Sequence, residues 1–289
     1  MGSPQGPVVL RRRLAMELRR LRTERELTVD QAAVKLGWSE SKLSRIETAK
    51  TGVGPANLAG LIRLYEVDSE EAEHLIELDR RARRPGWWRK YSDVLPSWYS
   101  AWVGLESEAR VIRTYQAQIV PGLFQTQDYA HAVLSAGVLP ELPEEVDRKV
   151  KLRLARQALF TRDDPPHISV VLDEAVLRRA VGGPETMRAQ LAHLLELAKL
   201  RNVELHVLPF EVGIHPGING SFEIFEFEPE DPKLVYVDTL TEAIYPDKPR
   251  EVGRYSMCFE QLRGAALNVA DSLRMIAAAE REFAKRPST

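Results

Sequence analysis

The N-terminal part of the chain has apolar residues at helical spacing. Leu14, Leu18 and Leu21 recur at i, i+4 and i+7, which predicts one amphipathic helix. The apolar positions of two shorter helices follow at Ala32, Ala33 and Leu36 and at Leu43 and Ile46. Two more helices are expected, one from Pro55 with Leu58, Leu61, Ile62 and Tyr65 buried, and one after Asp68 with Ala72, Leu75 and Ile76 buried. The pattern predicts an all-α domain of five helices over residues 8–84.

Local signals mark the ends of the second and third helices. Thr28 with Gln31 three residues later has the pattern of a capping box, in which each side chain accepts a bond from a backbone N–H group. Gly37 suits the left-handed residue that ends a helix, and Ser39 suits the cap that begins the next. Two short helices joined by a tight glycine turn are typical of a helix-turn-helix.

The rest of the chain, residues 85–289, mixes two periodicities. Helices are expected over residues 98–118 (with Leu105, Ala109 and Ile112 on one side), 125–136, 144–160, 184–200, 250–264 and 271–284. Runs of β-branched and aromatic residues at 167–172, 203–208, 221–227 and 234–237 predict strands. The run at 221–227 alternates apolar and polar residues, as expected of a strand with one face in water. The fold class is therefore α+β: the helical domain, then a larger domain with N-terminal helices, a mainly antiparallel sheet and C-terminal helices.

Composition narrows the class of protein. The 289 residues are 44% hydrophobic and 28% charged, which is ordinary for a soluble globular protein. No apolar run approaches the roughly 18 residues that a membrane span needs, and the first residues do not form a secretory signal. The single cysteine, Cys258, excludes an intrachain disulfide and a multi-cysteine zinc site. These features predict a cytoplasmic protein without membrane contact.

Charge is distributed unevenly along the chain. Residues 1–50 hold 11 Lys and Arg against 6 Asp and Glu, whereas the remainder holds 29 against 36. A basic N-terminal module on an acidic body favours a protein that contacts phosphate with one end. Residues 80–90 are also basic and include two tryptophans. This second segment is interpreted as a helix C-terminus complemented by cations rather than as another phosphate-binding patch.

Candidate chemistry is sparse in the second domain. Nucleophile, phosphate-loop and zinc motifs are missing, and the six histidines have no metal-ligand spacing. His215, in a loop between strands, and Cys258, in a helix, are interpreted as structural, and Asp173-Glu174 as a helix cap. We expect no catalytic residues, no metal and no cofactor, and hence no enzyme.

The outward face of the third helix is the strongest candidate site. That face carries Glu40, Ser41, Ser44 and Arg45, with Lys42 on its flank. Such side chains can donate to or accept from base edges in the major groove of DNA. An ordinary exposed helix has a similar pattern, so periodicity alone does not decide between the two.

The stretch from Leu27 to Lys50, LTVDQAAVKLGWSESKLSRIETAK, resembles the Cro/cI-type (XRE) helix-turn-helix family. The resemblance implies an ion pair between Arg22 and Glu47, because the family pairs an arginine of the first helix with the glutamate that closes the recognition helix. It places the base-reading positions on Glu40, Ser41 and Arg45. Val29 stands where the family usually has a glutamine that bonds phosphate or base, and valine cannot make that contact.

These observations assign roles within the module. The recognition helix is expected to span about Ser39 to Glu47 and to contact bases through Ser41 and Arg45. Lys42 and Ser39 are expected to contact phosphate. The full set of expected DNA-binding residues is Thr28, Ser39, Glu40, Ser41, Lys42, Ser44 and Arg45.

Three segments of the second domain resemble the large C-terminal domain of a family of actinobacterial XRE regulators, a domain with no assigned activity. They are Gln118 to Leu134, Leu172 to Leu194 and His215 to Phe222. Members of that family are described as antitoxin-like and are often encoded beside a small partner protein. The resemblance implies a regulatory or partner-binding role for residues 85–289.

The sequence therefore predicts a cytoplasmic, homodimeric regulator that binds double-stranded DNA in a sequence-specific way. Two alternatives differ in the role of the second domain. In one, the protein is an antitoxin whose main task is to bind a small toxin-like protein. In the other, it senses a ligand through a pocket lined by the strands around Val203 to Phe227.

Overall fold

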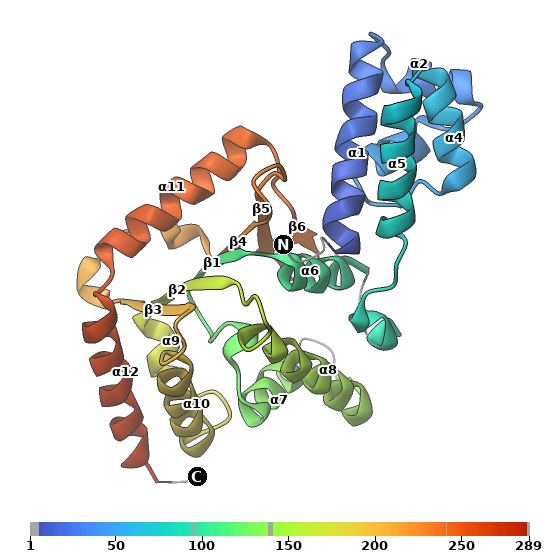
Figure 1. Cartoon of the computed structure of the whole chain (residues 1–289). Coiled ribbons are helices and arrows are strands. Elements are labelled where there is room, and N and C mark those ends of the chain that lie inside the picture. Colours follow the sequence, from blue (N-terminus) through green and yellow to red (C-terminus); the bar gives the residue numbers. More distant parts are fainter. Residues whose placement is uncertain (1–5, 94, 96, 138–140, 241, 288–289) are drawn as a thin grey trace. The chain divides into compact units, whose positions relative to one another are not determined.

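The structure, a computed structural model, describes residues 6–93, 95, 97–137, 141–240 and 242–287. The chain folds as two compact units that divide between Arg89 and Lys90 (Figure 1). The architecture is α+β, as the sequence predicts, with a helical N-terminal unit and a C-terminal unit built on a sheet. Within the described residues no helix is long and apolar enough to cross a membrane.

The N-terminal unit contains α1 (Pro7–Glu24), α2 (Val29–Leu36), α3 (Glu40–Glu47), α4 (Pro55–Leu64) and α5 (Ser69–Ala82). Helices α1 and α5 pack side by side, and α3 packs against α1 and α2 (Figure 1). The core of the unit includes Leu10, Leu14, Leu18, Leu21, Ala32, Ala33, Leu43, Ile46, Leu58, Leu61, Tyr65 and Leu75. All but the first of these positions were expected from the helical spacing.

The buried face of α5 differs from the expected one. Leu75 and Leu78 are buried, whereas Ile76 is 54% exposed. The buried stripe continues through Asp79 and Ala82, so it follows the i, i+3, i+4 and i+7 positions from Leu75. Ile76 lies one residue beyond that stripe, about 100° around the helix. The prediction that Ile76 is buried was therefore wrong.

The C-terminal unit has a mixed six-stranded sheet in the order β3-β2-β1-β4-β5-β6. Its strands are β1 (Val111–Gln116), β2 (His167–Asp173), β3 (Val203–Leu208), β4 (Phe222–Glu226), β5 (Leu234–Asp238) and β6 (Ala243–Ile244). The pairs β1–β2 and β2–β3 are parallel. The pairs β1–β4, β4–β5 and β5–β6 are antiparallel. Antiparallel pairs are thus the majority, and β1 lies where the two patterns meet.

Helices cover both faces of this sheet. The α-helices are α6 (Ser97–Glu108), α7 (Gln127–Ser135), α8 (Pro143–Ala155), α9 (Glu174–Arg178), α10 (Pro184–Leu197), α11 (Pro249–Ala265) and α12 (Val269–Ala284). Short 3-10 helices are η1 (Trp87–Tyr91), η2 (Gly122–Phe124), η3 (Arg156–Phe160), η4 (Phe210–Val212) and η5 (Pro216–Asn219). Figure 1 shows α11 on one side of the sheet and α7, α8 and α10 on the other. The parallel pairs need long crossover connections, which α7 to α10 supply.

The segment 98–118 is not one helix, as was expected. It forms α6 up to Glu108 and then the central strand β1. Val111 pairs with His167 on one side and Glu226 on the other, so β1 gains ladder hydrogen bonds along both edges. The β-branched residues Val111 and Ile112 also favour the extended backbone. Leu105 and Ile112 are buried as expected, but Leu105 belongs to α6 and Ile112 to β1.

Candidate DNA-binding surface

Helix α2 begins with a complete capping box. Gln31 N donates to Thr28 Oγ1 at 3.1 Å, and Thr28 N donates to Gln31 Oε1 at 2.9 Å. Two backbone donors that the helix itself cannot satisfy are bonded in this way. The cap uses Thr28 Oγ1 as an acceptor, so the hydroxyl proton remains available to donate to a phosphate.

The turn between α2 and α3 is set by one glycine and one serine. Gly37 has φ +69°, a left-handed conformation that glycine adopts without steric cost. Trp38 N donates to Ala33 O at 2.9 Å, which closes the turn. Ser39 then caps α3, because its Oγ accepts from Lys42 N at 3.2 Å. The left-handed Gly37 and the Ser39 cap both follow the sequence prediction.

Small and branched apolar residues hold α2 and α3 together. Ala32, Ala33 and Leu43 are at most 1% exposed, and Ile46 is 3% exposed. The alanines allow the two short helices to cross closely, and the larger Leu43 and Ile46 fill the space between α3 and the rest of the core. The opposite side of α3 is left on the surface.

A buried ion pair connects α3 to α1. Arg22 Nε donates to Glu47 Oε1 at 2.8 Å, and Arg22 Nη2 donates to Glu47 Oε2 at 3.0 Å. Arg22 Nη1 also donates to Leu27 O at 2.6 Å, so the guanidinium bonds both the end of α3 and the loop before α2. The bidentate geometry fixes the C-terminal end of α3 in angle as well as in distance.

The outward face of α3 presents the expected side chains. Glu40, Ser41, Ser44 and Arg45 are all exposed. Among the described residues, the side chains of Ser41 and Arg45 form no hydrogen bond and no ion pair. A free guanidinium on a fixed helix needs no internal bond to be broken before it meets a base edge.

Lys42 lies differently from its neighbours on α3. It is half-buried, its Nζ donates to Asn57 Oδ1 at 3.0 Å, and the same atom lies 3.9 Å from the centre of the Trp38 ring. Asn57 is itself anchored, because its Nδ2 donates to Val53 O at 2.8 Å. An ammonium group has three donors, so Lys42 can keep these contacts and still donate to a phosphate.

The contacts of Lys42 with Trp38 and Asn57 were not predicted from the sequence. The i, i+4 spacing of Trp38 and Lys42 was an available signal, although Trp38 precedes the helix. Asn57 lies on α4, 15 residues from Lys42, and no local pattern indicates such a contact. A cavity in the C-terminal unit was not predicted either, because its lining residues are far apart in the chain.

Of the candidates in the second domain, Asp173 is confirmed as a helix cap. Asp173 caps α9, since its Oδ1 accepts from Ala175 N at 2.8 Å. His215 Nε2 lies 3.8 Å from Asp173 Oδ2, and Cys258 is half-buried beside the core of α11. Among the described residues no group of three or more His, Cys, Asp or Glu could hold a metal ion.

Part of the basic segment over residues 80–90 is neutralised locally. Arg80 donates to Glu77, its Nε to Oε2 and its Nη2 to Oε1, each at 2.7 Å. Arg83 Nε donates to Asp79 Oδ2 at 2.9 Å. These pairs join neighbouring turns of the end of α5, where cations also complement the helix dipole.

Comparison with known families divides the chain in a similar way. Residues 13–75 match a family described as a helix-turn-helix domain, so the N-terminal unit is the DNA-binding domain of a regulator. No curated protein and no solved structure matches the chain. Residues 99–278, more than half of the chain, match a family described only as a domain of unknown function, DUF5753. The protein therefore belongs to the DUF5753 family and carries a helix-turn-helix domain at its N-terminus.

Proposed function

We propose that this protein is a transcriptional regulator that recognises a specific double-stranded DNA sequence through α3. The proposal rests on the outward face of α3. Ser41 and Arg45 are exposed there and have no partner among the described residues, while the bond from Arg22 to Glu47 fixes the helix. The planar guanidinium of Arg45 matches O6 and N7 of guanine, which is the commonest specific contact in the major groove.

Phosphate contacts would set the register of α3 on the duplex. The N-terminal ends of α2 and α3 carry the hydroxyls of Thr28 and Ser39, and helix N-termini attract anions through their free N–H groups. Lys42 adds a positive charge held at a fixed position by Asn57. These contacts position the protein without carrying sequence information themselves.

Mapping the protein on its own chromosome tests this proposal. A sequence-specific regulator should occupy discrete sites that share one motif, located near transcription start sites. Occupancy spread along the chromosome with no shared motif would show that binding is electrostatic only, because phosphate contacts alone do not distinguish sequences.

We further propose that the regulator acts as a homodimer that associates through its C-terminal unit. One helix-turn-helix covers a half-site, and two recognition helices bind adjacent half-sites roughly 34–36 Å apart. The C-terminal unit exposes Phe210, Ile214 and Ile218 within one loop region, at 57%, 82% and 65%. Light scattering should give twice the 32.7 kDa mass of one chain, and a single-chain mass at micromolar concentration would contradict the dimer.

The signal that controls DNA binding has two candidate sources. An antitoxin-like role, proposed from the family resemblance, would have a small neighbouring protein bind the C-terminal unit and change operator affinity. Titration of that protein into a preformed operator complex tests it, since regulation requires a coupling energy of typically 1–3 kcal/mol. The other source, a small ligand, is favoured by a cavity in the C-terminal unit.

A further inference from the structure

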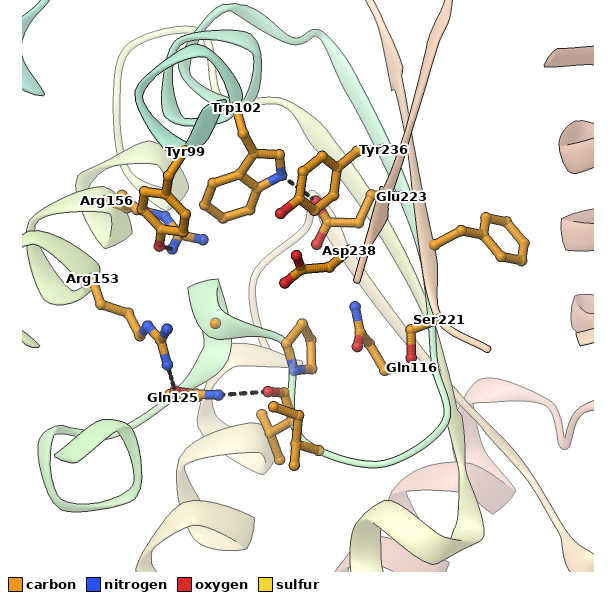
Figure 2. A pocket seen from close by; sticks show the side chains of 15 residues that line it. Tyr99, Trp102, Gln116, Gln125, Arg153, Arg156, Ser221, Glu223, Tyr236 and Asp238 are labelled. Atoms are coloured by element: carbon orange, nitrogen blue, oxygen red, sulfur yellow. Dashed lines mark hydrogen bonds between the residues drawn. The ribbon is translucent and has the colours of Figure 1, made fainter. Parts of the chain in front are cut away.

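The C-terminal unit contains a cavity of about 140 Å³ beneath α6. Residues from α6, the loop after β1, the end of α8 and the strands β4 and β5 surround it (Figure 2). A cavity of about 150 Å³ can hold benzene, so this one fits a compact metabolite and not a drug-sized ligand. All of its lining residues belong to the C-terminal unit, so it does not depend on the position of the DNA-binding domain.

One wall of the cavity is aromatic. The rings of Tyr99 and Trp102 have centroids 4.9 Å apart, and those of Trp102 and Tyr236 are 5.5 Å apart. Arg156 stacks on Trp102 with its guanidinium carbon 4.1 Å from the ring centre. Its guanidinium is neutralised by Glu106, with Nε and Nη2 each 2.7 Å from a carboxylate oxygen. Arg156 therefore stabilises the aromatic wall, and its charge is already paired with Glu106.

Arg153 differs from Arg156 because its charge has no counterpart. Its Nη1 donates to Gln125 Oε1 at 2.7 Å, and Gln125 is fixed in turn by a bond from its Nε2 to Val120 O at 2.7 Å. Arg153 Nε is buried without a hydrogen-bond partner, and among the described residues no carboxylate lies within ion-pair distance of the guanidinium. Burial lowers the pKa of Arg153, and the nearby Tyr99 and Glu106 offset this only in part.

Two carboxylates lie across the cavity from Arg153. Figure 2 shows Glu223 and Asp238 on the strand side, with Arg153 reaching in from the end of α8. Trp102 Nε1 donates to Glu223 Oε2 at 2.8 Å, but no basic side chain of the described residues forms an ion pair with Glu223 or Asp238. Partial burial raises the pKa of Asp238, and hydrogen bonds from the Tyr236 side chain and the Thr239 backbone, followed by the charge of Arg153, offset this only in part. The cation and the acids thus face each other with space between them.

We propose that this cavity binds a small zwitterion, a free amino acid or a close analogue with one carboxylate and one ammonium group. The ligand carboxylate bonds the guanidinium of Arg153, which its bond to Gln125 holds in a fixed orientation and which no carboxylate of the described residues neutralises. The ammonium faces Glu223 and Asp238, beside the aromatic rings of Tyr99, Trp102 and Tyr236, which attract cations. A purely anionic ligand would leave the two acids unpaired, and a purely cationic ligand would leave Arg153 unpaired.

Ligand binding by the full-length chain can be measured without DNA, so this test is independent of the proposed DNA-binding function. Each proteinogenic amino acid is screened at about 10 mM by thermal shift, because a ligand that binds the folded state raises the melting temperature. The dissociation constant of each binder is then measured by calorimetry. The analogues that lack either its carboxylate or its amine are measured in the same way. We expect at least one amino acid to bind. Both of its analogues should bind at least about tenfold more weakly.

Variants locate the site. Arg153→Gln should weaken binding of the amino acid at least about tenfold, whereas the matched control Arg148→Gln, also on α8, should leave it unchanged. Glu223→Gln keeps an acceptor for Trp102 Nε1. This variant should weaken binding of the zwitterion more than binding of the analogue that lacks the amine. Melting curves of the variants without ligand show whether each one is folded. The proposal is overturned if no amino acid binds, if an analogue with one charge binds as tightly, or if both folded variants bind normally.

Discussion

Arg22 bonds both carboxylate oxygens of Glu47 in a pair that is almost entirely buried. The side chains are 11% and 4% exposed, and the residues lie 25 positions apart in the chain. The pair joins the last turn of α1 to the last residue of α3. It therefore couples the orientation of the proposed recognition helix to the longest helix of its unit.

Removing one partner of this pair should be costly, because the other charge stays buried without compensation. We expect Glu47→Ala to lower the free energy of unfolding of the N-terminal unit by about 3 kcal/mol, and Arg22→Ala by a similar amount. The double variant should lose less than the sum, since no charge is left unpaired. Calorimetry of the full chain follows the transition of this unit. Fully additive losses would mean that the two side chains do not interact.

A buried tyrosine next to this pair carries an unsatisfied hydroxyl. Tyr65 is fully buried, and its OH group has no hydrogen-bond partner among the described residues. Burial also raises the pKa of Tyr65. We expect Tyr65→Phe to raise the free energy of unfolding by up to about 1 kcal/mol, because a buried polar group without a partner is costly. Tyr91→Phe, outside this core, should have little effect. A loss of stability in Tyr65→Phe would show that the hydroxyl does bond.

Glu223 should make stability depend on pH. Burial and the nearby Glu106 raise its pKa from 4.5 to about 7, and Arg156 and the bond from Trp102 offset this only in part. The charge of Asp238 on β5 also raises the pKa of Glu223. Without a bound ligand, the folded chain therefore keeps the Glu223 proton where the unfolded chain has lost it, so the free energy of unfolding falls as pH rises from about 4.5 to about 7.

Glu223→Gln removes this dependence. Above about pH 7 the variant should be more stable than the parent by on the order of 1–3 kcal/mol, and the difference should vanish towards about pH 4.5. Unfolding of both chains by urea across this range measures it. Parallel pH profiles for parent and variant would show that Glu223 titrates normally in the folded chain.

How far the sequence predicts the structure depends on how local the signals are. The helix-turn-helix was predictable because Thr28, Gly37 and Ser39 act within one turn of their own helix. Strand β1 was missed because its conformation is set by pairing with β2 and β4, from distant parts of the chain, and helical spacing appeared to continue through Ile112.

The cavity was unpredictable for the same reason. It brings Tyr99, Arg153, Glu223 and Asp238 together from four separate elements, and no spacing in the sequence relates them. The run at 221–227 predicted a strand with one wet face, and Glu223 does alternate with buried neighbours. That glutamate nevertheless faces the cavity and the indole of Trp102 rather than open water.

Lys42 tests the phosphate contacts separately from base recognition. Lys42→Ala should weaken binding to specific and nonspecific duplexes alike, and should reduce the slope of log affinity against log salt by about 0.9, the value for one phosphate contact. Asn57→Ala frees the ammonium and should change the slope less, because the charge remains. An unchanged slope in Lys42→Ala would assign Lys42 a structural role only, in its contacts with Trp38 and Asn57.

The proposed recognition of bases by α3 depends most on the side chain of Arg45. The most direct measurement is selection of bound duplexes from a random-sequence pool by the full-length parent and by Arg45→Ala. Arg63→Ala, an exposed arginine on α4, serves as the control. We expect the parent to enrich a motif with two half-sites, and Arg45→Ala to lose preference at one base pair in each half-site, a loss of about 1–3 kcal/mol of discrimination. An unchanged motif in Arg45→Ala, or no enriched motif with the parent, would contradict the claim.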